Sequence, residues 1–480
     1  MLAEGQSSVR YAAGTDREDH GHVTESGREG LFAGLFGRGE VGVADHDWLQ
    51  AMLDTEAALA RALERAGLAE AGAGVAVTAA AQADRFDAAE IGRQAALTGN
   101  PVPALVRTLA DSLPAGGPRE AVHRGATSQD IIDTAMMLLA RRAIDVIDTD
   151  LAVAADRAAV LAETHAATVM AGRTLLQQAV PVTFGLIAAG WLSALDEARR
   201  ELRRVRSARL AIQFGGAAGT LASLGAAGTA VSGLLAQELD LREPALPWHT
   251  DRLRVLQLAA SLAGVCAALG KIARDVTLLA QTEVGEVAEG SDDPRQGGSS
   301  AMPHKRNPVA SVIILGCTRR APGLLATLAA AAEQELQRAA GGWHAEWEPL
   351  ADLMRLTGSA AWWSVRLLTG LRIDADRMRA NLDAAGGLPL AEHVAAQLAP
   401  KLGRIAAHDL VAAASAHAAT HGLDLAAALL ADPDAAAALR GAGIGRAELD
   451  AAVDPAGYLG ASAEFIRRAV TAHGGRADVT

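Results

Sequence analysis

The spacing of apolar residues predicts a protein built mainly from long helices. Between residues 130 and 171 the chain contains neither glycine nor proline, and its apolar residues recur at the spacing of one helix face. These residues are Ile131, Met136, Leu139, Ile144, Ile147, Leu151, Val160 and Leu161. A single helix over this stretch would be several times the usual length, so we expect it to dominate the fold.

Four further stretches have the same helical pattern, at residues 183–214, 251–289, 309–340 and 343–371. Gly316 and Pro322 fall inside the third stretch and are expected to strain it. The sequence has no alternating strand pattern of comparable length. We therefore expect an all-α fold with a long central bundle of five helices.

The length of 480 residues exceeds a single typical core, so two or three domains are expected. We assign residues 31–129 to an N-terminal helical domain, residues 130–371 to the bundle and residues 372–480 to a C-terminal helical domain, where glycines and prolines shorten the helices. Residues 1–30 are polar and mix acids with bases. They are expected to be a disordered tail, neither a signal peptide nor a membrane anchor.

The composition indicates which classes of partner are unexpected and which cellular compartment is expected. The formal net charge is −12, and no run of Lys and Arg resembles a nucleic-acid patch. No uncharged apolar stretch reaches the roughly 20 residues that a membrane span needs, so neither nucleic acid nor membrane is an expected partner. Cys266 and Cys317 lie far apart in apolar, helical surroundings and are predicted to be buried free thiols, which is typical of the cytoplasm.

Reactive groups gather in the segment GSSAMPHKRNP, residues 298–308. The stretch before it is polar and rich in turn residues, and prolines close its end, as in a lid. The segment resembles the signature loop, GSSxMPxKxNP, of the fumarase/aspartase superfamily, whose members add or remove a group beta to a carboxylate. The resemblance covers roughly residues 31 to 470. It implies three mostly helical domains and catalytic roles for Ser299, Lys305 and Asn307.

A second loop, HRGATSQD at residues 123–130, stands before the longest helix. Taken alone, it could equally be a helix cap, with Ser128 or Asp130 as the N-cap, or an anion site, because both use the same groups. The loop is similar to the family's HxGxTS segment. That similarity implies that Thr127 and Ser128 bind a substrate carboxylate and that His123 belongs to the site.

A third segment, GRTLLQQA at residues 172–179, resembles the family's GxTHxQ element. Leu175 replaces the histidine that protonates the leaving group in the family's lyases. A departing amine or hydroxide needs such a proton, whereas a carboxylate, with a pKa of about 4, leaves as a stable anion. Leu175 therefore favours a carboxylate as the leaving group or, in reverse, as an internal nucleophile that forms a lactone.

The muconate cycloisomerase branch of this superfamily lacks the same histidine, and five further stretches resemble that branch: residues 48–54, 99–103, 247–250, 342–347 and 457–460. The resemblance implies lactonisation of 3-carboxy-cis,cis-muconate, a tricarboxylate diene, to 4-carboxymuconolactone. In that reaction Ser299 would deliver a proton to carbon, and Lys305 and Asn307 would stabilise an enediolate. Further expected substrate-binding residues are Asn100, Arg173, Thr174, Gln177 and Arg252. At the last of these the chain reads DRLR where relatives carry QRDR.

Apolar residues spread around much of each long helix, so a lone subunit cannot bury them all. We expect a homotetramer whose active sites combine the three loops from different subunits. The sequence has no HExxH, paired CxxC or clustered ligand set, and we expect neither metal nor cofactor.

Other assignments stay open. His249 and His344 are equally compatible with substrate contact and with packing, and Glu283, Glu286 and Glu289 are expected to form a solvated or salt-bridged helix face. Two other functions remain: a superfamily lyase that releases fumarate, such as adenylosuccinate lyase, and an inactive structural protein. Leu175 argues against the first, and the intact loop at residues 298–308 argues against the second.

Overall fold

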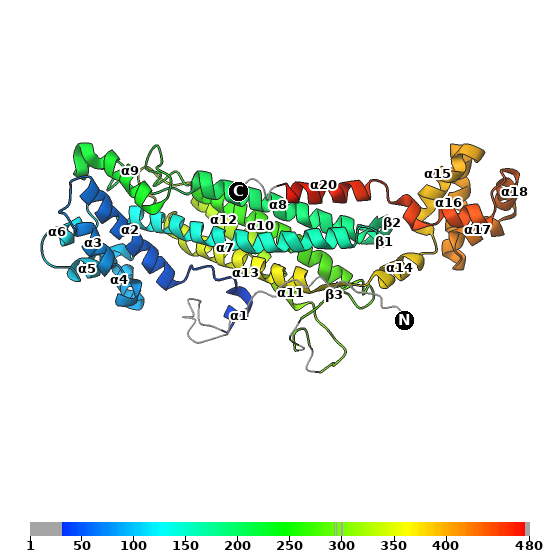
Figure 1. Cartoon of the computed structure of the whole chain (residues 1–480), viewed down its shortest axis with the longest axis horizontal. Helices are drawn as coiled ribbons and strands as arrows, with labels where there is room; N and C mark the ends of the chain where they lie inside the picture. Colours follow the sequence, from blue (N-terminus) through cyan, green and yellow to red (C-terminus); the bar gives the residue numbers. More distant parts are fainter. Residues whose placement is uncertain (1–30, 292, 294, 299–300, 476–480) are drawn as a thin grey trace, which may run out of the picture.

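A computed structural model of the chain describes residues 31–291, 293, 295–298 and 301–475. The molecule is elongated, with a central helical bundle along its long axis and smaller groups of helices at either end (Figure 1). The all-α prediction is confirmed. The expected catalytic residue Ser299, its neighbour Ser300 and the tail at residues 1–30 lie outside the described residues.

The helices of the bundle are α7 (Ser128–Thr164), α8 (Phe184–Arg209), α10 (Leu253–Leu279), α11 (Val309–Thr318), α12 (Ala321–Ala331) and α13 (Trp347–Gly370). Helix α7 packs against α8 and α13, and α10 packs against α8, α11 and α13. Buried alanines recur along α7, among them Ala135, Ala140, Ala154 and Ala158. Small side chains at these positions let neighbouring helices approach closely.

The N-terminal end of the molecule holds α1 (Ala33–Phe36), α2 (Asp45–Arg65), α3 (Ala73–Ala80), η1 (Ala83–Arg85), α4 (Ala88–Thr98), α5 (Val102–Asp111) and α6 (Gly117–Ala121). Next to α2 lies α9 (Gly228–Leu239), which follows the short helix η2 (Ala222–Ala227). The short helix η3 (His344–Glu346) leads into α13. Of these elements, α2 and α5 pack against α7, which begins directly after the second predicted loop.

The C-terminal end contains α14 (Ala375–Asp383), η4 (Leu388–Leu390), α15 (Ala391–Leu402), α16 (Arg404–His421), α17 (Leu425–Ala431), α18 (Pro433–Gly441), α19 (Arg446–Ala452) and η5 (Pro455–Tyr458). Apolar residues of α15 to α19 form a core separate from that of the bundle, with Val394, Leu429 and Leu449 at its centre. The last helix, α20 (Ser462–Gly474), returns to the bundle and lies along α8 (Figure 1).

Three expected helices are shorter than the sequence suggests. The first ends at Thr164 and is followed by an antiparallel hairpin of β1 (Val169–Thr174) and β2 (Gln177–Thr183). The helix expected over residues 251–289 ends at Leu279, and β3 (Val287–Glu289) then pairs with β4 (Leu371–Ile373). The helix expected over residues 309–340 breaks after Thr318, because Pro322 restarts it as the first turn of α12.

Two helical segments are long and apolar enough to cross a membrane by length and composition alone, namely α10 and residues Val309–Ala331. Both pack into the bundle. However, only 50% of the most apolar 18-residue stretch of α10 is buried, and only 39% of the corresponding stretch of Val309–Ala331. Both segments therefore leave apolar surface that this chain does not cover.

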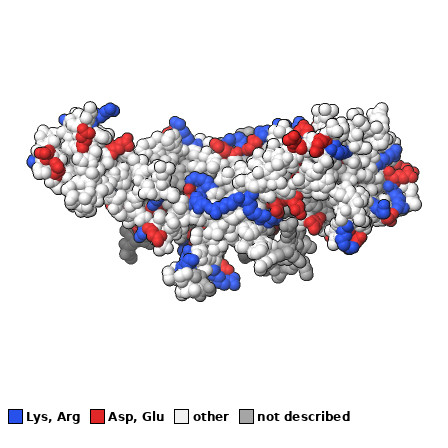
Figure 2. All heavy atoms as spheres, turned by 180° about the vertical axis from the view of Figure 1, so that it is seen from behind, with Lys and Arg blue, Asp and Glu red and all other residues white. Residues whose placement is uncertain are grey.

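The face of the molecule in Figure 2 is largely uncharged, with positive and negative groups interspersed. Cys266 and Cys317 are buried and unpaired, as predicted.

Candidate active site

The loop before α7 is held by the carboxylate of Asp130. The N-cap is Thr127, in an extended conformation, so the expectation that Ser128 or Asp130 would occupy this position is wrong. Asp130 instead accepts a hydrogen bond from the Thr127 N–H at 3.0 Å. It also accepts hydrogen bonds from the N–H groups of Gly215 and Gly216 and lies 2.6 Å from His249 Nε2. Thr127 and Ser128 remain half-buried at the helix start, where backbone dipoles favour an anion.

His123 is oriented by a carboxylate that the sequence did not single out. Its backbone N–H donates to Glu56 at 2.9 Å, and its ring Nδ1 lies 2.7 Å from the other oxygen of the same carboxylate. Burial alone would lower the pKa of His123, but the hydrogen bond and charge of Glu56 outweigh it and raise that pKa. Nε2 has no partner among the described residues and can face a ligand.

Asn100 lies at the same end of the molecule. Its side-chain oxygen accepts a hydrogen bond from the Val102 N–H at 3.1 Å, at the start of α5. His344 Nε2 lies 3.0 Å from the carbonyl oxygen of the preceding residue, Gly99. A pocket of about 620 Å³ opens beside them and is lined by Pro101 and by Ile132 of α7, among others. His123, Thr127 and Ser128 thus lie at or just before the start of α7, and Asn100 lies next to Pro101, which lines this pocket together with Ile132 of α7.

Arg252 occupies a different environment from the one expected. All five of its N–H groups are used: they donate to the carboxylates of Asp133 and Glu346 and to the backbone oxygen of Trp248. The side chains of these three charged residues are at most 1% exposed. The expectation that Arg252 binds substrate is therefore wrong for this structure, because the guanidinium has neither a free donor nor access to solvent.

The opposite end of α7 carries the β1–β2 hairpin, and its base is fixed by Arg173. Arg173 donates to both oxygens of Glu286, at 2.9 and 2.6 Å, and Asn381 donates to the same carboxylate at 2.9 Å. Glu286 is fully buried and lies beyond the end of α10, so the expected helix face of glutamates does not form. Thr174 and Gln177 flank the hairpin tip and are exposed.

The base of the signature loop is closed at two points. Asn307 donates from its backbone N–H to Gly297 O at 2.8 Å. Glu289 accepts hydrogen bonds from the first N–H groups of α11, those of Ala310 and Ser311, each at 2.9 Å. Lys305 lies between these closures and is exposed. The loop thus presents a cation from a fixed base.

One chain does not bring the three segments together. Helix α7 has 37 residues and is about 55 Å long at about 1.5 Å per residue, and it separates the loop at residues 123–130 from the hairpin. The described part of the signature loop projects from the side of the bundle, away from the start of α7 (Figure 1). The loop at residues 123–130 is therefore presented separately from the hairpin, whose base the Arg173–Glu286 ion pair joins to the segment that leads into the signature loop.

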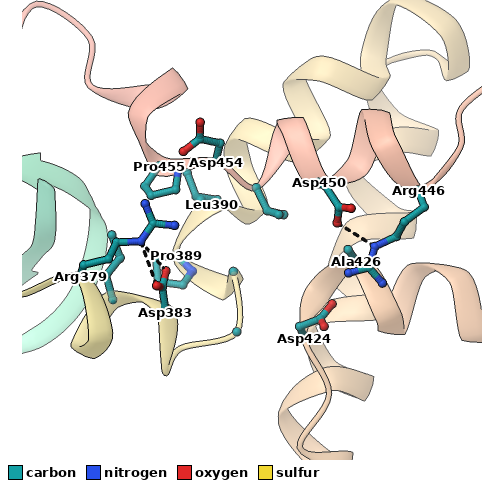
Figure 3. A pocket seen from close by; sticks show the side chains of 14 residues that line it. Arg379, Asp383, Pro389, Leu390, Asp424, Ala426, Arg446, Asp450, Asp454 and Pro455 are labelled. Carbon is teal, nitrogen blue, oxygen red and sulfur yellow. Dashed lines mark hydrogen bonds and ion pairs between the residues drawn. The ribbon is translucent and has the colours of Figure 1, made fainter. Parts of the chain in front are cut away.

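A further pocket of about 330 Å³ lies among the C-terminal helices (Figure 3). Its two arginines are already paired, Arg379 with Asp383 and Arg446 with Asp450. Their charges are neutralised locally, and the pocket contains none of the expected site residues.

Known proteins match this chain over most of its length. A family model described as "Lyase" matches residues 44–323, and one described as "Adenylosuccinate lyase C-terminus" matches residues 387–469. The chain is 45% identical over 432 residues to the 3-carboxy-cis,cis-muconate cycloisomerase of Pseudomonas aeruginosa, covering 90% of this chain and 93% of that one. It is 46% identical over 441 residues to the nitrosuccinate lyase of Streptomyces davaonensis, covering 90% and 92% respectively.

Among solved structures, the crystal structure of the 3-carboxy-cis,cis-muconate lactonizing enzyme from Pseudomonas putida matches with a TM-score of 0.86 at 43% identity, covering 92% of this chain and 99% of that chain. The lyase model spans more than half of the sequence, and these relatives are matched over nearly their whole length. The chain therefore belongs to the lyase family of the fumarase/aspartase superfamily.

Proposed function

We propose that the protein is a cycloisomerase that lactonises 3-carboxy-cis,cis-muconate to 4-carboxymuconolactone without metal or cofactor. Leu175, a 97% exposed hydrocarbon side chain at the hairpin tip, supports a reaction whose reacting group is already a stable anion. Lyases of the superfamily place an acid there, and a carboxylate nucleophile needs none. The relatives named for this reaction add to the argument.

The residues can be assigned to a balanced reaction. One substrate carboxylate attacks a carbon of the diene, which forms the C–O bond of the lactone and leaves an electron pair delocalised into a neighbouring carboxylate as an enediolate. Lys305 and Asn307 stabilise this added charge, and Ser299 gives a proton to the carbon. His123, Thr127, Ser128 and the free donors of Arg173 bind the other carboxylates, with Asn100, Thr174 and Gln177 at the periphery.

The active form we propose is a cytoplasmic homotetramer with shared sites. Two features support it: α7 holds two of the loops about 55 Å apart, and α10 and the α11–α12 region leave apolar surface uncovered. Light scattering at micromolar protein tests the proposal. A fully active monomer would contradict it.

A second candidate follows from the relative named nitrosuccinate lyase. A nitro group beta to a carboxylate would leave as nitrite, a stable anion, while the remaining carbon skeleton becomes fumarate. Leu175 suits this elimination as well as it suits lactonisation, because neither reaction requires protonation at the position of the missing histidine. It argues equally against adenylosuccinate, whose leaving group is an amine.

One experiment separates these functions. The purified enzyme is incubated in EDTA with 3-carboxy-cis,cis-muconate, and the loss of diene absorbance is followed in the ultraviolet. Parallel reactions with nitrosuccinate and adenylosuccinate are assayed for nitrite and fumarate. Turnover of the muconate at much the highest kcat/KM is expected. Faster nitrite release would assign the second function, and loss of activity in EDTA would contradict the cofactor-free proposal.

A further inference from the structure

The hairpin tip has an unusual backbone for its sequence. Leu175 and Leu176 connect β1 to β2, with φ values of 51° and 63°. They are the only consecutive non-glycine residues with positive φ in the part of the chain that the structure describes. Two-residue hairpin turns of this kind favour Asn-Gly, and other L-residues are disfavoured there by about 1 kcal/mol or more each.

The same two side chains are also unfavourably solvated. Leu175 is 97% exposed and Leu176 is 70% exposed. Neither therefore stabilises the core of this chain. An Asn-Gly turn would lower both the backbone strain and the exposed apolar surface. Strain and exposure at a single position of a structure favour a functional explanation.

The tip stands on a rigid base. Arg173, two residues before Leu175, is fixed by the buried carboxylate of Glu286. On the other strand, Gln178 donates to Asn381 O at 3.2 Å. The two leucines therefore project as a fixed apolar surface beside a guanidinium.

We propose that Leu175 and Leu176 form an apolar wall of the active site that covers the diene of the substrate and removes water from the attacking carboxylate. This inference rests on the proposed function. A planar diene needs an apolar surface, which the tip provides, and Arg173 keeps donors that Ala171 and Glu286 do not use for a carboxylate at the edge of the diene. A carboxylate without its hydration shell is also a better nucleophile. The two leucines are thus specificity-determining residues for substrates whose reacting group is already a stable anion.

The test replaces the turn by the residues that its backbone favours. In the double variant Leu175→Asn/Leu176→Gly, the melting temperature should equal or exceed that of the wild type, while kcat/KM should fall at least roughly tenfold, as expected for the loss of apolar contacts in a site. The variant Leu175→Met/Leu176→Met keeps the apolar surface and should retain most of the activity. Asp240→Gly is the control, since it relieves a positive φ of 49° at the end of α9, where Asp240 contacts Arg141 of α7 and none of the expected site residues, and it should leave kcat/KM unchanged.

The kcat/KM of each variant is divided by that of the wild type, measured with whichever substrate the wild type turns over. If the proposed function is wrong, the wild type fails to turn over the muconate. If only the role of the two leucines is wrong, the ratio stays near one. Light scattering accompanies each variant. An Asn-Gly variant with wild-type kcat/KM would overturn the inference. So would a loss of activity that coincides with dissociation, because the turn would then be an assembly contact.

Discussion

Arg173 and Glu286, 113 residues apart in sequence, form a two-point ion pair with N–O distances of 2.9 and 2.6 Å. The pair joins the base of the β1–β2 hairpin to the segment that leads into the signature loop. Because Glu286 is fully buried and also accepts from Asn381 of α14, one carboxylate fixes three segments of the chain.

Glu286→Gln should therefore weaken both the fold and the site. The amide has one acceptor oxygen where the carboxylate has two, so it cannot accept every hydrogen bond from Arg173 and Asn381. The loss of the charged partner should lower the free energy of unfolding by about 1.5–3 kcal/mol. Urea unfolding measures this loss, and KM should rise as Arg173 loses its fixed position. Glu283→Gln, at an exposed position nearby, is the control. Unchanged stability in Glu286→Gln would mean that the ion pair contributes little.

Arg252→Met tests the reassignment of Arg252 to the interior. The substitution leaves Asp133 and Glu346 buried without their cation, which should cost about 3–5 kcal/mol of stability. Activity per folded molecule should stay near that of the wild type. Arg274→Met, at an exposed position of α10, should be nearly neutral. A stable Arg252→Met enzyme with a greatly raised KM would restore Arg252 to the substrate site.

The ion pair between His123 and Glu56 predicts a pH dependence of stability. The folded-state pKa of His123 is raised above its ordinary value of 6.5. The stability that this charge contributes is therefore complete below pH 6.5 and is lost as the pH rises through the raised value. The difference in unfolding free energy between wild type and His123→Asn should shrink over that window.

His165 provides a control of opposite sign, because burial lowers its pKa. Its protonation opposes folding, so His165→Asn should gain stability relative to wild type at acidic pH only. Urea titrations at a series of pH values measure both differences. A difference for His123→Asn that does not change with pH would show that the histidine stays neutral.

The signature loop predicts activity losses without unfolding. Ser299→Ala and Lys305→Met should each lower kcat by at least roughly 10², the loss expected for an acid–base or electrostatic group. Ser300→Ala is the matched control and should be milder. Melting temperatures should match the wild type, since Lys305 is exposed. A Ser299→Ala enzyme with wild-type turnover would remove that serine from the mechanism.

Helix α7 could be predicted because it contains neither glycine nor proline, and the other long helices because their apolar residues recur at helical spacing. The hairpin could not, because six- and seven-residue strands joined by two leucines give neither a strand alternation nor a turn signal. The boundaries of the three domains remain predictions.

Residues that lie within a sequence motif could be proposed as site residues from the sequence, but the residues that hydrogen-bond to them could not. Glu56 lies 67 residues from His123, and no local pattern reports such a pairing. The misassignment of Arg252 has the same origin, since the two acids that enclose it come from α7 and from the short helix η3. A motif identifies the residue type at a position, whereas burial is decided by how distant helices pack.

The length of α7 has a genetic consequence. In a tetramer that shares its sites as proposed, a subunit damaged in the loop at residues 123–130 still offers an intact hairpin and signature loop to its neighbours. A subunit damaged at Lys305 still offers an intact helix start. Two inactive alleles of this kind, expressed together, should assemble some mixed sites with every loop intact and so restore part of the activity that neither allele provides alone.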